Sequence, residues 1–230
     1  MTHRSVARIV ALVRDLGPLA TDVVFIGGAV APLLHTASPL PEARPTKDVD
    51  GVLASTRYDH AHAFHDALRA RGFRHDTAVS AHLHRWHAPS GVRFDLVPAG
   101  AHLGGSGNLW DAEAIASAVV ATIDGVAFRH VAAPAFLAMK LAAYADRGGD
   151  DLRASHDMED IIALIASRPT VAAETAVASA AVRARLVAFA TTLLKSGLAE
   201  VVAAAHLNNA DDPTTAIRGT LARLAALAAL

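Results

Sequence analysis

The sequence contains no cysteine, few aromatic residues and no long apolar run. Without cysteine the chain has no disulfide framework, no zinc–thiolate site and no thiol nucleophile, as is usual for cytoplasmic proteins. No uncharged apolar stretch reaches the length of about 18 residues that a membrane-spanning helix needs. Arg8 and Arg14 interrupt the N-terminal apolar pattern, which argues against a secretory signal sequence. We therefore expect a cytoplasmic protein with no membrane contact.

Lysine is also scarce, and the two signs of charge nearly cancel. Three of the 21 basic residues are lysines, at positions 47, 140 and 195, and the net charge is −1. This balance excludes strong non-specific attraction to nucleic acid, so any such contact needs a local basic patch. The chain has 230 residues, of which 53% are hydrophobic, which suffices for one large or two small domains with a sizeable core.

The residues that suggest chemistry begin with a glycine pair. A short apolar strand, expected at 22–26, runs into Gly27 and Gly28, followed by a helical pattern from 29 to 34. Glycine tolerates positive φ and lets the backbone approach a phosphate closely. The free N–H groups at the start of the next helix also suit an anion. The segment therefore predicts a phosphate-binding turn.

Acidic residues follow on two expected strands. Asp48 and Asp50 are two residues apart, so on a strand they share one face, roughly 6.5–7 Å apart. Two such carboxylates repel each other unless a positive charge lies between them. Mg²⁺ takes oxygen ligands from one or two carboxylates together with substrate phosphates. Asp95 lies within an apolar strand expected at 92–98, where an ionised carboxylate needs a partner. If the two strands are neighbours, the three carboxylates converge, and we expect them to bind metal.

This order of motifs, a glycine pair, D-x-D twenty residues later and a lone aspartate on a later strand, resembles the DNA polymerase β-like nucleotidyltransferase superfamily. Residues 134–141, then Arg147 and residues 156–161, are similar to the P-x-x-L-x-x-K-L … R … K-D-x-x-D block of the AbiEii-type toxins. Those toxins are the nucleotidyltransferase partners in bacterial type IV toxin–antitoxin and phage-defence pairs. The resemblance covers residues 20–165 and departs at His156, where the family pattern has lysine.

The resemblance implies transfer of a nucleoside monophosphate from an NTP to an acceptor, with release of pyrophosphate. Two Mg²⁺ ions on Asp48, Asp50 and Asp95 would stabilise the attacking and leaving oxygens. Asp95 would also activate the acceptor hydroxyl. Asp157 would hold Lys140 or Arg147 in place. The acceptor would be tRNA or another nucleic acid, with a neighbouring antitoxin as partner. The nucleotide-binding residues expected are Gly27, Gly28, Lys47, Lys140, Asp157 and Asp160.

Other interpretations of the same residues remain open. A nucleotidyltransferase acting on a small molecule such as an antibiotic, and a catalytically silent member that only binds a partner, fit the same motifs. Lys140 is alternatively a helix residue whose amine reaches solvent. His156-Asp157 also matches the metal pair of H…HD…D phosphohydrolases, although the strand-rich first half argues against their all-helical fold. His82 and His84 are either metal ligands or a solvent-facing strand surface. Four arginines are expected to form either a patch that binds nucleic acid or a solvated strand face: Arg71, Arg74, Arg85 and Arg93.

Apolar periodicity predicts an α+β protein. The resemblance implies a mixed nucleotidyltransferase-type sheet with flanking helices over residues 1–130, and helical patterns predict an all-helical C-terminal domain over residues 131–230. The expected helices of the first domain are 4–17, 56–71 and 111–118, and its later strands are 73–78, 81–87, 92–98 and 126–131, with a flexible glycine-rich loop at 100–108. The expected C-terminal helices are 134–146, 155–167, about 171–190, 191–206 and 213–229, the last with Asp212 as N-cap and Pro213 in its first turn.

Overall fold

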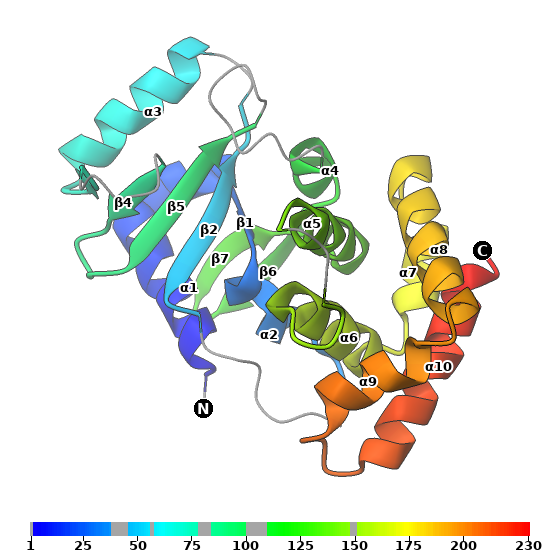
Figure 1. Cartoon of the computed structure of the whole chain (residues 1–230). Coiled ribbons are helices and arrows are strands. Elements are labelled where there is room, and N and C mark those ends of the chain that lie inside the picture. Colours follow the sequence, from blue (N-terminus) through cyan, green and yellow to red (C-terminus); the bar gives the residue numbers. More distant parts are fainter. Residues whose placement is uncertain (1, 38–45, 56–57, 78–83, 100–109, 148–150) are drawn as a thin grey trace. The chain divides into compact units, whose positions relative to one another are not determined.

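The first half of the chain is built on one β-sheet (Figure 1). The structure is a computed structural model that describes residues 2–37, 46–55, 58–77, 84–99, 110–147 and 151–230. Within these ranges seven strands pair in the order β3-β4-β5-β2-β1-β7-β6. They are β1 (Val23–Ile26), β2 (Asp48–Leu53), β3 (Arg74–His75), β4 (Arg85–His87), β5 (Arg93–Pro98), β6 (Val119–Ile123) and β7 (Val126–His130).

The sheet is mixed, because β2 pairs with β5 and β1 with β7 in parallel while the other neighbours are antiparallel. All four residues of the central strand β1 are buried, as expected for a continuous apolar run with a neighbour on each side. The predicted α+β class, a mixed sheet with flanking helices followed by further helices, is confirmed.

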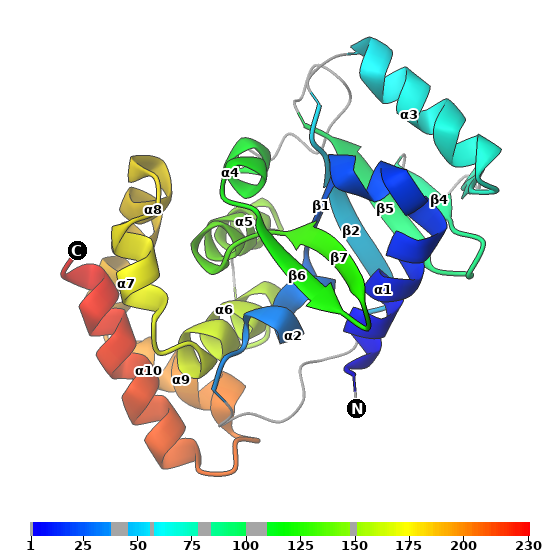
Figure 2. The same ribbon diagram turned by 180° about the vertical axis from the view of Figure 1, so that it is seen from behind.

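Helix α1 (Arg4–Leu16) lies across the face of the sheet that is turned forward in Figure 2. Its buried residues recur at helical spacing, with Val6, Ile9, Val10 and Val13 facing inward, as the sequence predicts. Helix α3 (Tyr58–Ala70) packs its His65 ring against Trp86 of β4, with the ring centroids 5.2 Å apart. The shorter elements of this part are η1 (Gly17–Asp22), η2 (Gly28–Val30), α2 (Ala31–Leu34) and α4 (Asp111–Ala116).

Three element predictions are wrong. No strand is predicted at 119–123, yet β6 pairs with β7 across the turn at Asp124 and Gly125, a dipeptide typical of tight hairpins. The edge position of β6 leaves Val119 and Val120 exposed, so its apolar residues give no buried pattern. The helix predicted over 171–190 is two helices, α7 (Val171–Ala176) and α8 (Ala180–Lys195), because Ser179 caps a new start by accepting from Val182 N–H. The helix predicted over 191–206 starts later, since α8 continues to Lys195 and α9 begins only at Ala199.

The remainder of the chain is helical in the part that the structure describes. It contains α5 (Ala133–Asp146), α6 (His156–Ser167), α7, α8, α9 (Ala199–Leu207) and α10 (Pro213–Ala228). The predicted start of α10 is confirmed: Asp212 Oδ1 accepts from Thr215 N–H at 3.1 Å, and Pro213 is the first residue. No single described helix is long and apolar enough to cross a membrane; α8 and α9 reach that length and composition only together, with a bend of 102° between them.

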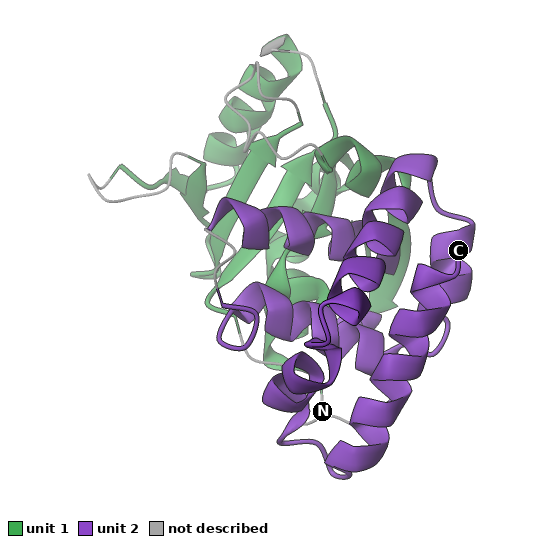
Figure 3. Cartoon of the chain, turned by 45° about the vertical axis from the view of Figure 1, so that its right-hand side comes forward, with its two compact units in different colours: residues 1–32, 44–132 green, residues 33–43, 133–230 purple. Residues whose placement is uncertain are grey.

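The chain divides into two compact units, coloured separately in Figure 3. Unit 1 comprises residues 1–32 and 44–132, and unit 2 comprises residues 33–43 and 133–230. The units differ from the predicted domains in the segment 33–43, which groups with the C-terminal helices. Hydrogen bonds explain this grouping, because Thr36 N–H and Ala37 N–H both donate to Ser167 O and Arg168 Nη1 donates to Leu34 O.

Candidate functional site

The acidic residues singled out in the sequence lie on neighbouring strands of unit 1. In the parallel pair β2–β5, Asp50 is opposite Asp95, and Asp48 is opposite Arg93. Residues that pair across two strands share a face of the sheet. The intervening residues Val49 and Phe94 are fully buried on the other face. Strands β2 and β5 are therefore neighbours, as convergence of the three carboxylates requires. Asp48, Asp50 and Asp95 share one half-exposed face of the sheet.

The glycine pair lies directly beside this face. Strand β1 is antiparallel to β2 with Ile26 opposite Asp50, so Gly27 follows at the level of that carboxylate. Gly27 has φ 70° and ψ −169°, a region that essentially only glycine populates. A Cβ atom at Gly27 would lie 2.1 Å from Asp50 Oδ2. The absence of a side chain at Gly27 thus lets the Asp50 carboxylate approach the main chain where Gly28 opens η2.

Two arginines balance the charge of these acids. Arg85 of β4 donates from Nε to Asp95 Oδ1 at 2.8 Å and from Nη2 to Asp95 Oδ2 at 2.7 Å. The same Nη2 donates to Asp48 Oδ2 at 3.2 Å, so Arg85 joins two of the acids. Arg93 Nη2 lies 2.6 Å from Asp48 Oδ1. The hydrogen bonds to Asp95 raise the pKa of Arg85 above its usual range despite the opposing effect of burial.

Arg85 and Arg93, for which a nucleic-acid patch or a solvated strand face is expected, are both paired with the acids. Contact of these arginines with nucleic acid stays a prediction. The sequence contains a signal for this pairing. Strands β4 and β5 form a hairpin across the turn at Pro89 to Gly91, and an antiparallel hairpin sets Arg85 directly opposite Asp95. Of the other two arginines, Arg71 donates to Asp15 O at 2.8 Å, and Arg74 is exposed on β3.

The donor atoms suit a hard divalent cation, although the arginines supply positive charge in this structure. Carboxylate oxygens are the ligands that Mg²⁺ prefers. Asp48 Oδ1 is buried and accepts no hydrogen bond from the described residues; its contact with Arg93 is an ion pair only. Within the described ranges no group of three or more His, Asp or Glu side chains is arranged to hold a metal ion. The assignment of Asp48, Asp50 and Asp95 as metal ligands stays a prediction.

The predicted nucleotide-binding residues of the second half contact one another within unit 2. Lys140 Nζ lies 3.2 Å from Asp157 Oδ1 and 2.5 Å from Asp160 Oδ2. Arg147 Nη1 also contacts Asp157, which is buried. Burial alone would lower the pKa of Lys140, but Asp160 and Asp157 outweigh it and the pKa is raised. With 15% of its side chain exposed, Lys140 is a paired cation between α5 and α6 and not a solvent-reaching residue. Its contact with a nucleotide stays a prediction.

The remaining candidates are placed as follows. Lys47 is exposed immediately before Asp48. His156 contacts Glu159, with 3.2 Å between Nδ1 and Oε2, and nothing near it in the described part of the chain completes the metal site of a phosphohydrolase. His84 lies just before β4, whereas His82 and the glycine-rich loop 100–108 lie outside the described residues.

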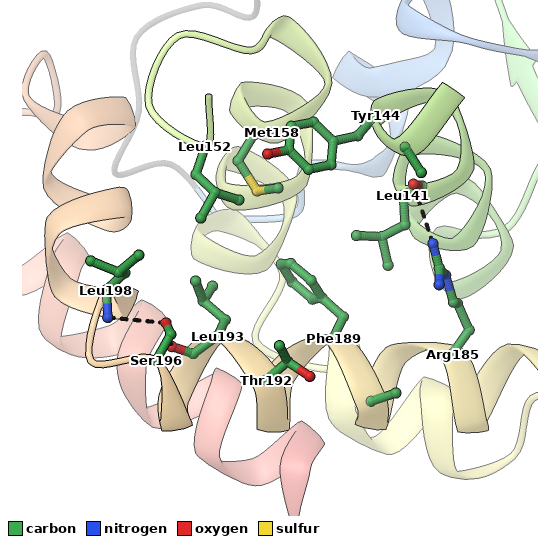
Figure 4. Close-up of a pocket in the computed structure, with 12 residues that line it drawn as sticks. Leu141, Tyr144, Leu152, Met158, Arg185, Phe189, Thr192, Leu193, Ser196 and Leu198 are labelled. Carbon is green, nitrogen blue, oxygen red and sulfur yellow. Dashed lines mark hydrogen bonds between the residues drawn. The ribbon is translucent and has the colours of Figure 1, made fainter. Parts of the chain in front are cut away.

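Unit 2 also contains an apolar pocket of about 520 Å³ between α5, α6 and α8 (Figure 4). Phe189 and Leu193 of α8 face Leu141 of α5 and Met158 of α6 across it. At one side Arg185 Nη2 donates to Leu141 O at 3.3 Å. None of the predicted site residues lines this pocket.

No protein-family model matches the chain, and no curated protein matches it. Among solved structures the chain is similar to the crystal structure of an antigenic nucleotidyltransferase-like protein from Paracoccidioides brasiliensis. The identity is 20%, the match covers 70% of this chain and 75% of that chain, and the TM-score is 0.49. This likeness is too distant to show what the chain does, so its function rests on its own site.

Proposed function

We propose that the chain is a Mg²⁺-dependent nucleotidyltransferase that moves a nucleoside monophosphate from an NTP to an acceptor hydroxyl. The observation that carries the proposal is the packing of Asp50 against Gly27, with Asp48 and Asp95 on the same face of adjacent strands. The glycine pair and the D-x-D motif are thus neighbours in space as well as in motif order. A phosphate-binding turn beside three carboxylates is an arrangement suited to phosphoryl chemistry.

In this reaction the acceptor oxygen forms a bond to the α-phosphorus, and the bond from that phosphorus to the bridging oxygen of pyrophosphate breaks. Asp48, Asp50 and Asp95 would hold the Mg²⁺ ions, which supply charge neutralisation for the triphosphate. Asp95 takes the proton of the acceptor hydroxyl. Each oxygen of Asp95 accepts one hydrogen bond from Arg85, which leaves a second lone pair on each oxygen for the acceptor hydroxyl.

The more specific proposal is a cytoplasmic toxin of the AbiEii type, with tRNA or another nucleic acid as acceptor and an antitoxin as partner. It rests on the K-L … R … D-x-x-D block, whose Lys140, Arg147, Asp157 and Asp160 form one contact group. In the same scheme Lys47 and Lys140 contribute charge to triphosphate binding. A small-molecule acceptor such as an antibiotic requires the same transfer chemistry, so the identity of the acceptor decides between the two.

A second candidate is a catalytically silent protein of the same architecture that only binds a partner. One observation favours it specifically. Arg85 and Arg93 already neutralise Asp48 and Asp95, so these acids do not need a metal ion to be stable. Under this candidate the arginines are permanent structural partners, and neither Mg²⁺ nor an NTP binds.

A labelling experiment tests both candidates. The protein is incubated with total RNA, Mg²⁺ and each α-labelled NTP, alongside Asp50→Asn, Asp95→Asn and the control Asp66→Asn. Asp66 is an exposed acid of α3 that belongs to none of the motifs and is paired with Arg69. Label in a tRNA-sized band that disappears only in the Asp50 and Asp95 variants supports the toxin proposal. Label confined to small molecules selects the antibiotic-type enzyme. No label, together with no Mg²⁺-dependent NTP effect on Tm, selects the silent protein.

A further inference from the structure

A second polar site in unit 1 is a cavity of about 580 Å³ whose walls carry several cationic residues. Arg8 of α1, Lys47 before β2 and Arg93 at the start of β5 all line it, and so does His87 at the end of β4. The turn 90–92 between β4 and β5 completes this wall. Three cations from three separate elements therefore meet at one cavity, which is within the range of about 300–1,000 Å³ typical of ligand sites.

The charges of these residues are only partly balanced. Arg93 is paired with Asp48, and His87 Nε2 lies 3.2 Å from Asp76 Oδ2. Arg8 donates to the main-chain oxygen of Thr46, which leaves its positive charge unneutralised. Among the residues that the structure describes, no carboxylate forms an ion pair with Arg8 or with Lys47. Two carboxylates also lie at the wall, since Asp76 pairs with His87 and Asp15 Oδ2 accepts from Ser90 N–H at 3.0 Å. Arg8 and Lys47 are therefore the cations of the cavity that are available to an anion.

We propose that this basic cavity binds the phosphate groups of a phosphate ester. Arginine and lysine are the side chains that bind phosphate most strongly, through charge-assisted hydrogen bonds. An apolar or cationic ligand gains nothing from Arg8 and Lys47, whereas an anion forms ion pairs with both. The phosphates belong either to a nucleotide or to the backbone of a nucleic-acid acceptor.

Arg93 connects the cavity to the acidic face, because it lines the cavity and forms an ion pair with Asp48. An anion in the cavity competes with Asp48 for Arg93, so occupation of the cavity releases an Asp48 oxygen toward the acidic face. This coupling rests on the proposed transferase function, whereas phosphate binding in the cavity does not.

The test measures binding without Mg²⁺, in EDTA, with a short fluorescent single-stranded RNA by anisotropy and with ATP and pyrophosphate by calorimetry. The variants are Lys47→Gln and Arg8→Gln, with Lys195→Gln at the exposed end of α8 as the matched control. Loss of one charge-assisted contact, worth about 1.5–3 kcal/mol, predicts a weakening of about tenfold or more in the first two variants. The salt slope of log affinity for RNA should fall by about 0.7 for each lost phosphate contact.

If RNA binding depends on Lys47 and ATP does not displace the RNA, the cavity binds the acceptor backbone. If the binding of ATP or pyrophosphate depends on Lys47, the cavity binds the nucleotide. Equal binding in all three variants, or no binding of any probe at low salt, overturns the proposal. Arg8 contacts Thr46, so a folding defect in Arg8→Gln leaves the decision to Lys47→Gln, whose exposed side chain is not needed for packing. Asp50→Asn separates the two proposals, because it should abolish transfer and leave Mg²⁺-free phosphate binding unchanged.

Discussion

Replacement of Arg85 by glutamine is the sharpest test of how the acidic face is held together. The change removes three hydrogen bonds and the positive charge between Asp48 and Asp95. The side chains are 13% exposed for Arg85, 30% for Asp48 and 21% for Asp95, so the pairs are mostly buried. Breaking a fully buried pair costs about 3–5 kcal/mol, and partial exposure reduces this to about 2–3 kcal/mol. At about 2–4 °C per kcal/mol for a chain of this size, Tm in EDTA should fall by about 4–12 °C.

The same variant should bind divalent cations more tightly than the wild type. Without Arg85 the face keeps its three carboxylates but loses one of two cations, so Mg²⁺ becomes the better neutralising partner. A ligand at a hundred times its Kd stabilises the folded state by about 2.7 kcal/mol, which is comparable to the loss caused by the substitution. Differential scanning fluorimetry over a MgCl₂ series should therefore show a steep recovery of Tm in Arg85→Gln and a smaller rise in the wild type.

Arg153→Gln is the matched control, because Arg153 is 68% exposed and lies 3.8 Å from an exposed partner, Asp151. Its Tm should stay within about 1 °C of the wild type, since exposed ion pairs contribute little. An unchanged Tm of Arg85→Gln in EDTA would refute the reasoning that this arginine holds the acids. A reduced Tm that Mg²⁺ does not restore would refute the metal site and favour the silent protein.

Three further predictions follow from the same contacts. Gly27→Ala should cost about 1–3 kcal/mol of unfolding free energy in urea and displace Asp50, whereas Gly125→Ala, also at positive φ but with open space around it, isolates the backbone strain alone. Lys140→Gln should lower the free energy of unfolding by about 3 kcal/mol at neutral pH, because Asp157 loses a buried partner. Since the pKa of Lys140 is raised in the folded state, the wild type keeps this contribution below pH 10.5. It loses the contribution only as the pH rises through the folded-state pKa. Burial, and secondarily Arg69, lowers the pKa of His65, so wild-type stability should decline as pH falls below 6.5, and His65→Phe should remove that slope in pH-dependent melts; an unchanged slope would contradict the assignment.

The acidic face could be predicted because its signal is local. A spacing of two residues puts Asp48 and Asp50 on one face of any strand, and the apolar residues around Asp95 indicate a second strand. Arg85 could not be assigned in the same way, since its partner depends on the register of a hairpin whose strand β4 has only three residues. One residue of slip would turn Arg85 to the opposite face.

The C-terminal helices show the same division between local and non-local signals. The start of α10 was predictable because Asp212 and Pro213 form a local cap. The break between α7 and α8 was not, since alanine favours helix on both sides of it and gives no contrast between buried and exposed positions. Packing rather than propensity decides where such helices end.

The segment 33–43 makes the architecture non-modular. Because the chain enters unit 2 at residue 33, leaves it at 44 and re-enters it at 133, no single cut in the gene separates the two units. In a fragment of residues 133–230, Ser167 O would lose the N–H groups of Thr36 and Ala37 that donate to it. Arg168 would lose Leu34 O, the main-chain oxygen that accepts its hydrogen bond. Recombination at one breakpoint therefore cannot transfer the helical unit intact to another protein.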